Sequence, residues 1–302
     1  MDDSLASATG KFVEFFDRVA QTEWNKSIQR SLIHWIGLTG EQQVLDAGCG
    51  AGHLLMRLAQ RAAWVTGIDT SHAMIKKAIA NTSENGVANV TLQVGNVRNL
   101  PFDDETFDTV VCVDLLFLFD DQKRVLKELL RVCKPTGQVV IVNPAVTMNP
   151  WSTKTYCETH RLDEFERDSI LAWATASARR TLLTDRQMAL LADQCAGELT
   201  DSATMLDQLA AVFRIVPVLE EHRGLTEKLS EAENTETVSE HAVRMDSENG
   251  NGEGMDSPVS VLEPGPALEL VSNAASESTS PQESAANLTM ESAKNSRLEP
   301  AD

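Results

Sequence analysis

Apolar residues near the N-terminus recur at the spacing of an α-helix. Residues three or four positions apart share one face of a helix. The apolar positions here are Phe12, Phe15, Phe16, Val19, Trp24, Ile28, Leu32, Ile33 and Trp35, and Gly37 follows them. The pattern predicts two amphipathic helices within residues 8–37, the second ending at Gly37.

From residue 43 the pattern changes to short apolar runs that alternate with helical segments. The runs predict five strands at 43–47, 64–69, 90–94, 109–113 and 138–142. Helices are expected at 53–61, 71–81 and 121–132, with Ser71 as a cap of the second. Strands that alternate with helices form a parallel sheet with helices on both faces. We therefore expect an α/β fold with a Rossmann-like, doubly wound, mostly parallel sheet.

The alternation ends at Pro144. Residues 146–197 are expected to form a helical insert, with helices at 168–178 and 184–195, and residues 205–216 to supply the last strand or strands. The core then covers about 40–145, and the domain covers 1–224.

The remaining residues, 225–302, have no apolar periodicity and are rich in Ser, Glu, Asn and Thr. They contain 16 acidic and 4 basic residues, and so carry about −12 of the net charge of −19. A segment of this composition cannot bury enough surface to offset its ordering entropy. It is interpreted as a disordered acidic tail, either a solvating segment or a site for a partner.

Charge and cysteine content narrow the class of protein. An acidic chain repels nucleic acid and anionic membranes, so neither is expected as a partner. The five cysteines are widely spaced and form no CxxC pair, which argues against disulfides, a zinc site or any other metal centre. The N-terminus resembles no signal peptide and no stretch is apolar enough to span a bilayer, so we expect a cytoplasmic protein.

A glycine-rich turn follows the first strand. The segment Asp46–Gly52 reads DAGCGAG, so a strand that ends in an acid leads through glycines into a helix. Glycines allow close backbone approach to a ligand, and a helix N-terminus offers free N–H groups. Asp46 would repel a pyrophosphate, and His53 stands where a dinucleotide loop has its third glycine. These two residues disfavour a dehydrogenase-like or nucleotide-sugar protein.

Further polar residues follow the next strands. Asp69 ends the second strand and can accept both hydroxyls of a ribose. Asn96 and Val97 come after the third strand, where a polar side chain beside a backbone N–H can read an adenine edge. Asp114 follows the fourth strand. All of these positions are carboxyl ends of strands, where open α/β sheets bind ligands.

Together these segments resemble the class I S-adenosylmethionine (SAM)-dependent methyltransferases, of the small-molecule group similar to the ubiquinone/menaquinone-biosynthesis methyltransferases (methyltransferase type 11 domain). The matching segments are 44–52, 67–69, 95–102, 107–108 and 128–137. The resemblance implies SAM as cofactor and a binding role for Asp46, Gly48, Cys49, Gly50, Asp69, Thr70, Met74, Asn96, Val97 and Val113. Within that set, Asp69 would hold the ribose, and Asn96 and Val97 the adenine. Asn96 stands where the family usually has aspartate.

The expected reaction is an in-line displacement that moves a methyl group from SAM to a small-molecule acceptor. Alignment in a dry pocket supplies most of such catalysis, and a base is needed only if the acceptor must lose a proton. The catalytic residue is therefore left unknown, with His160, His34 and His72 as candidates. Phe16, Trp24, Trp151 and Tyr156 are the expected substrate-pocket residues. The alternative is a non-catalytic SAM-binding scaffold that recruits a partner through the tail. The acceptor and the oligomeric state stay open.

Overall fold

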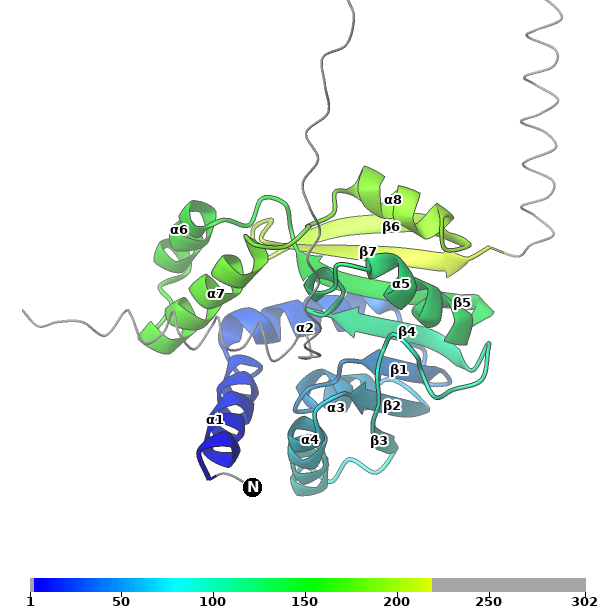
Figure 1. Cartoon of the computed structure of the whole chain (residues 1–302), viewed down its shortest axis with the longest axis horizontal. Coiled ribbons are helices and arrows are strands. Elements are labelled where there is room, and N and C mark those ends of the chain that lie inside the picture. The colour runs from blue at the N-terminus through cyan, green and yellow to red at the C-terminus, as the bar shows by residue number, and fades with distance from the viewer. Residues whose placement is uncertain (1–2, 219–302) are drawn as a thin grey trace, which may run out of the picture. The chain divides into compact units, whose positions relative to one another are not determined.

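A computed structural model describes residues 3–218, and the predicted tail lies outside the described residues. A seven-stranded sheet has the order β3-β2-β1-β4-β5-β7-β6 (Figure 1). The strands are β1 (Gln43–Ala47), β2 (Trp64–Asp69), β3 (Val90–Val94), β4 (Phe107–Val113), β5 (Cys133–Pro144), β6 (Gly197–Met205) and β7 (Ala210–Pro217). The first five are parallel, whereas β7 runs antiparallel to both β5 and β6. The predicted mostly parallel α/β sheet is confirmed.

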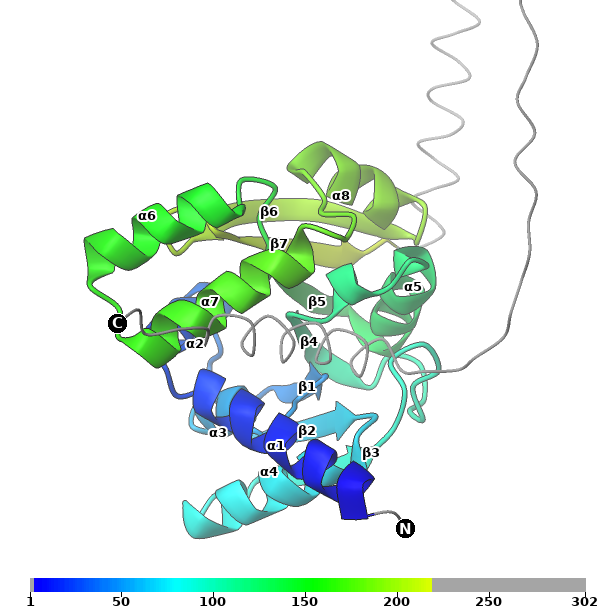
Figure 2. The ribbon, with the colours of Figure 1, turned by 60° about the vertical axis from the view of Figure 1, so that its left-hand side comes forward.

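Helices cover both faces of this sheet (Figures 1 and 2). They are α1 (Asp3–Val19), α2 (Glu23–Ile36), α3 (His53–Ala59), α4 (His72–Glu84), η1 (Leu116–Leu118), α5 (Gln122–Val132), α6 (Pro150–His160), α7 (Glu164–Ser177) and α8 (Asp185–Asp193). One apolar core packs α5, α8 and η1 against the sheet, and the other packs α2, α3, α6 and α7.

The alternation of side chains along the central strands produces these two cores. Leu45 of β1 and Val110 of β4 belong to the core with α5, whereas Val44 and Val111, their neighbours in sequence, belong to the core with α2. All four are fully buried. Successive side chains in a strand point to opposite faces, so a continuous apolar run is what a strand covered on both faces requires.

Several helix ends have capping residues, and the cap predicted at Ser71 is confirmed. The hydroxyl oxygens of Ser71 and Thr184 accept hydrogen bonds from backbone N–H groups in the first turns of α4 and α8. Gly37 ends α2 with a φ of 74°, a left-handed conformation that glycine adopts without strain. Asp121, predicted to lie in a helix, is the cap of α5.

The region after residue 132 differs from expectation. The strand predicted at 138–142 is longer in the structure, because β5 begins at Cys133 opposite Phe107 of β4. The predicted insert at 146–197 is helical, with α6, α7 and α8, but the strand that follows begins earlier than predicted: β6, at the edge of the sheet, starts at Gly197 and has mostly exposed side chains. Because β6 buries so few residues, it lacks the apolar alternation that marks a strand. Helix α7 begins at Glu164, four residues before the predicted start, because Asp163 caps it.

Among residues 3–218, no helix combines the length and apolarity that crossing a membrane requires.

Candidate functional site

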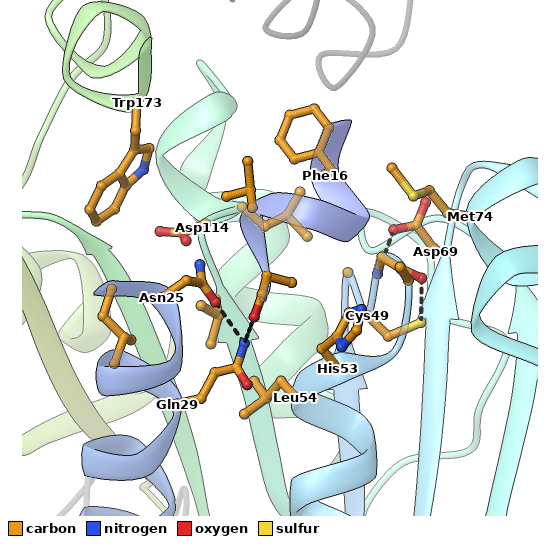
Figure 3. A pocket seen from close by; sticks show the side chains of 18 of the residues that line it. Phe16, Asn25, Gln29, Cys49, His53, Leu54, Asp69, Met74, Asp114 and Trp173 are labelled. Carbon is orange, nitrogen blue, oxygen red and sulfur yellow. Dashed lines mark hydrogen bonds between the residues drawn. The ribbon is translucent and has the colours of Figure 1, made fainter. Parts of the chain in front are cut away.

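A cavity of about 230 Å³ lies at the carboxyl ends of the central strands. Strand β1 lies between β2 and β4, so consecutive crossovers run in opposite directions from it. Open α/β sheets bind ligands at such a switch point. The residues that follow β1, β2 and β4 form the floor of the cavity, and helices α1, α2 and α7 supply its walls (Figure 3).

The glycine-rich loop after β1 brings backbone to the cavity. The N–H groups of Gly48 and Cys49 both donate to the carbonyl of Ile68, at 2.8 and 3.0 Å. Gly48 has a φ of 91°, a conformation that strains any residue with a Cβ, and a Cβ there would lie 2.6 Å from Leu115 Cδ2. Gly50 has a φ of 51° and open space where a Cβ would stand. The loop therefore presents an open backbone surface to a ligand beside Gly50.

Asp69 ties this loop to the next strand. Its Oδ2 accepts the N–H of Gly50 at 3.1 Å, and its Oδ1 accepts the N–H of Ser71 at 2.8 Å. The side chain is buried and lines the cavity. A carboxylate accepts hydrogen bonds at several positions, and this one stands at the cavity beside the glycine-rich loop.

Asp46 is buried in β1 without full hydrogen bonding. Asp46 is 2% exposed, and its Oδ2 has no hydrogen-bond partner among the described residues. Burial, with the charge of Asp69 added, raises the pKa of Asp46 to about 7. An unpaired buried carboxylate is costly, and a cationic group placed in the cavity would relieve that cost.

Asp114 is a second carboxylate of this kind. It follows β4 directly, with a left-handed φ of 53°, and lines the cavity. Its buried Oδ1 has no hydrogen-bond partner in the described part of the chain. Burial raises the pKa of Asp114 to about 7. From the sequence, Asp114 is predicted to follow a strand end but is given no role. Its position at the carboxyl end of a strand was the signal that could have marked it as a site residue.

Helix α1 is held against the cavity by a polar cluster around Asp17. The Asp17 carboxylate lies 2.8 Å from His53 Nε2 and 3.3 Å from Lys77 Nζ, and it accepts a hydrogen bond from Asn81 at 2.9 Å. Burial alone would raise the pKa of Asp17, but the bonds from His53 and Asn81 hold it below its ordinary value. The cluster joins α1 to α3 and α4, and His53 itself lines the cavity.

Aromatic side chains form the opposite wall. Trp24 of α2 stacks on Trp173 of α7, with ring centroids 5.5 Å apart and planes at 18°. The indole N–H of Trp24 donates to Ser169 Oγ at 3.0 Å, whereas the buried Nε1 of Trp173 has no hydrogen-bond partner among the described residues. Phe16 of α1 also faces the cavity (Figure 3). Sequence reasoning missed Trp173 because only the fold brings α7 over the strand ends.

Residues 38–206, more than half of the chain, match the family described as a methyltransferase domain. The chain belongs to this methyltransferase domain family. SAM is the cofactor of the family, and the resemblance stated above is confirmed.

Individual relatives cover parts of this methyltransferase. A phosphatidylethanolamine N-methyltransferase from Cereibacter sphaeroides is 44% identical over 102 residues, which cover 33% of this chain and 50% of that protein. A ubiquinone biosynthesis O-methyltransferase from Coxiella burnetii is 33% identical over 135 residues, covering 41% of this chain and 57% of that protein. The chain thus spans about half the length of the curated relatives that it matches.

A solved structure shows the same fold. The magnesium protoporphyrin IX methyltransferase of Synechocystis PCC 6803, with bound SAH (S-adenosylhomocysteine, the demethylated cofactor), aligns at a TM-score of 0.52 and 16% identity. The alignment covers 72% of this chain and all of that one.

The cavity of the methyltransferase domain fits SAM. The cofactor carries an ammonium group, a sulfonium and a ribose. The unpartnered Oδ2 of Asp46 suits a cation, the carboxylate of Asp69 is of the chemical type that accepts hydroxyl groups, and the open space beside Gly50 allows close approach.

The structure gathers most of the predicted site residues around the cavity. Those that line it are Phe16, Trp24, Asp46, Gly48, Cys49, Gly50, Asp69, Met74 and Val113. Thr70, Asn96 and Val97 do not line it. The Oδ1 of Asn96 accepts the N–H of Arg98 at 2.9 Å, and Val97 is buried in the core. Burial, with the charge of Asp46 added, raises the pKa of Cys49 far above its usual range, so its thiol stays neutral.

Two predicted pocket residues lie elsewhere. Trp151 is 78% exposed at the start of α6, and Tyr156 is buried against His160, with ring centroids 4.2 Å apart. Neither lines the cavity, so the structure does not bring these two predicted residues to this pocket. The reason is that α7, rather than α6, covers the strand ends.

The three candidate bases also lie away from the cavity. His160 pairs with Asp207 at 2.7 Å, and His34 and His72 are exposed on α2 and α4. None of them is among the residues that line the cavity. The histidine that does line the cavity is His53, which sequence reasoning treated only as a departure from a dinucleotide loop.

The raised pKa of Asp46 predicts a pH-dependent stability of the cofactor-free protein. Between about pH 4 and 7 the folded state keeps a proton that the unfolded state has lost, so the free energy of unfolding falls as pH rises. Each such group contributes up to about 1.4 kcal/mol per pH unit. In urea unfolding at pH 5 and 7, Asp46→Asn should show a fall smaller by about 1 kcal/mol per pH unit than the wild type. Equal falls in the two proteins would refute the burial argument.

The Asp17 cluster predicts that one substitution loosens α1. Asp17→Ala removes contacts to His53, Lys77 and Asn81, and should lower the free energy of unfolding by about 1–3 kcal/mol. Trypsin cleavage after Lys11 should become faster because α1 opens more often. Glu14→Ala, an exposed change on the same helix, is the control. Identical cleavage rates for the two variants would show that the cluster does not hold α1.

Proposed function

We propose that this protein transfers a methyl group from SAM to a small-molecule acceptor by in-line displacement. The observation that carries the proposal is a single cavity in which a cofactor cradle meets an aromatic wall. The small volume of the cavity supports a small acceptor. Bound SAM supplies an electrophilic methyl group, and the protein has to align the acceptor with it and exclude water.

The proposed cofactor contacts follow the order of the strands. Asp46, at the end of β1, would hold the ammonium group, and Asp69, at the end of β2, would accept the ribose hydroxyls. Gly48 and Gly50 would pass beneath the methionine part. The adenine would extend toward Asn96 and Val97, because β3 lies next to β2.

The acceptor would enter on the other side, between α1, α2 and α7. Phe16, Trp24 and Trp173 line this part of the cavity. The names of the two curated relatives give a nitrogen acceptor for one and an oxygen acceptor for the other. These relatives therefore support a methyl acceptor outside protein and nucleic acid but do not select the atom.

The cofactor assignment predicts the effect of one substitution. Asp69→Ala removes two charge-assisted hydrogen bonds to the ribose, each worth about 1.5–3 kcal/mol. The Kd for SAM, measured by calorimetry, should rise on the order of a hundredfold or more. Asp103→Ala, at an exposed position, is the matched control. Circular dichroism checks the fold, because Asp69 also accepts the N–H groups of Gly50 and Ser71. An unchanged Kd in folded Asp69→Ala would show that the ribose lies elsewhere.

The acceptor class is tested by following the methyl group. Purified protein and SAM with an isotopic methyl group are mixed with a cell extract, which is then separated by size. Label in the small-molecule fraction is the expected result. Label in protein or RNA would contradict the proposal. No transfer despite tight SAM binding would favour the alternative of a non-catalytic scaffold.

A further inference from the structure

The charges that line the cavity are unbalanced. Its ionisable side chains include Asp46, Asp69 and Asp114, together with His53, which is paired with Asp17. No lysine or arginine occurs among the described residues that line it. An acceptor with a carboxylate or phosphate at its reacting end would find no counter-ion here, and the three carboxylates would repel it. A cationic acceptor would be attracted.

Asp114 belongs to a different part of the cavity from the other two carboxylates. The charge of Asp69 contributes to the raised pKa of Asp46, so these two groups act on each other. Burial raises the pKa of Asp114, and Figure 3 shows its carboxylate apart from that of Asp69. The proposed ammonium and ribose contacts of SAM occupy Asp46 and Asp69. The Oδ1 of Asp114 is left buried and unpartnered.

The surroundings of Asp114 suit an organic cation. Figure 3 shows its carboxylate on the Trp173 side of the cavity, near Asn25 and away from Asp69 and Met74. Aromatic faces attract ammonium groups through their quadrupoles, by about 0.5–2 kcal/mol each. The unpartnered Nε1 of Trp173 adds a donor for a polar substituent on the same ligand. The other titratable groups that line the cavity are Cys49 and His53. Behind them, the pKa of Cys112 is raised chiefly by burial, with the charges of Asp46 and Asp114 adding to it.

We propose that the methyl acceptor is an amine, whose ammonium form binds against Asp114 within the aromatic wall and passes its proton to Asp114. This inference rests on the proposed function and names the substrate class for the same cavity. Asp114 then has two tasks, to attract the cation and to act as the catalytic base.

The reaction balances without a further reactant. A proton moves from the ammonium nitrogen to Asp114 Oδ1, which leaves a lone pair on nitrogen. That lone pair forms the new bond to the methyl carbon, while the bond from this carbon to sulfur breaks and its electron pair stays on sulfur. The products are a methylated ammonium ion, SAH and a protonated Asp114, which returns its proton to solvent. A phenol would instead have to become an anion beside three carboxylates.

A pair of probes with equal shape and different charge tests the ammonium subsite. Choline and 3,3-dimethylbutan-1-ol differ in one atom, a cationic nitrogen in place of a neutral carbon. With SAH bound, calorimetry on the full chain should give a Kd for choline at least tenfold lower than for the neutral alcohol. Equal binding of the two probes, or no binding of either, would overturn the inference.

Substitutions then locate the preference at Asp114. Asp114→Asn keeps the shape and removes the charge, so the preference for choline should fall below threefold while SAH binding stays unchanged. Trp173→Leu should also reduce the preference, and it serves as the second variant if Asp114→Asn does not fold. Asp103→Asn, an exposed loss of one carboxylate, should leave the preference intact. A full preference in folded Asp114→Asn would contradict the assignment.

The position of the label separates this inference from the proposed function. Mass spectrometry of the labelled product should place the methyl group on nitrogen. A methyl group on oxygen or carbon of a small molecule would overturn the amine inference and leave the proposed function standing. Label found only in macromolecules would overturn both.

Discussion

The site depends on the carboxylate of Asp69, which joins two strand ends. By accepting the N–H groups of Gly50 and Ser71, it fixes the glycine-rich loop after β1 to the start of α4 after β2. These bonds set the backbone beside which the cofactor must lie. The strand order β2-β1-β4 then places Asp46 between Asp69 and Asp114 at the carboxyl ends of the strands. The chemistry of the cavity follows from this row of carboxylates.

Buried carboxylates without partners destabilise a protein unless a ligand or a proton compensates them. Asp46 and Asp114 each have an oxygen in this condition, and burial keeps the pKa of both near 7. The fold tolerates them because two apolar cores hold the strands from both faces. The unpartnered carboxylates lower the stability of the ligand-free protein and raise its affinity for cations. SAM and an ammonium acceptor both bring such positive charge. The aromatic wall from α1, α2 and α7 excludes the water that would weaken this attraction.

Local signals in the sequence were enough to predict the residues of β1 and β2 that line the cavity. Asp46 and Asp69 each end an apolar run, and the glycines after Asp46 mark a close backbone approach, so both could be placed from short segments. The caps at Ser71 and Thr184 were predictable for the same reason. Asp114 received no role because its value depends on β4 lying next to β1, which only the sheet order shows.

The misplaced elements have a related cause. Trp151 and Trp173 are both tryptophans on helices of the same region, and only packing decides that Trp173 faces the cavity and Trp151 faces solvent. Strand β6 was missed because an edge strand with exposed side chains carries little apolar pattern. Long-range packing thus decides which residues of α7 face the cavity, whereas local sequence pattern is enough to indicate the residues at the ends of β1 and β2.

The most direct test of the central claim, that the strand-end carboxylates divide the cavity into cofactor and acceptor subsites, is a crystal structure with SAH bound. The account predicts the ammonium group of SAH within hydrogen-bond distance of Asp46 and the ribose hydroxyls on Asp69, with Asp114 left facing open space beside Trp173. SAH whose ammonium group instead contacts Asp114, or which lies outside this cavity, would contradict it.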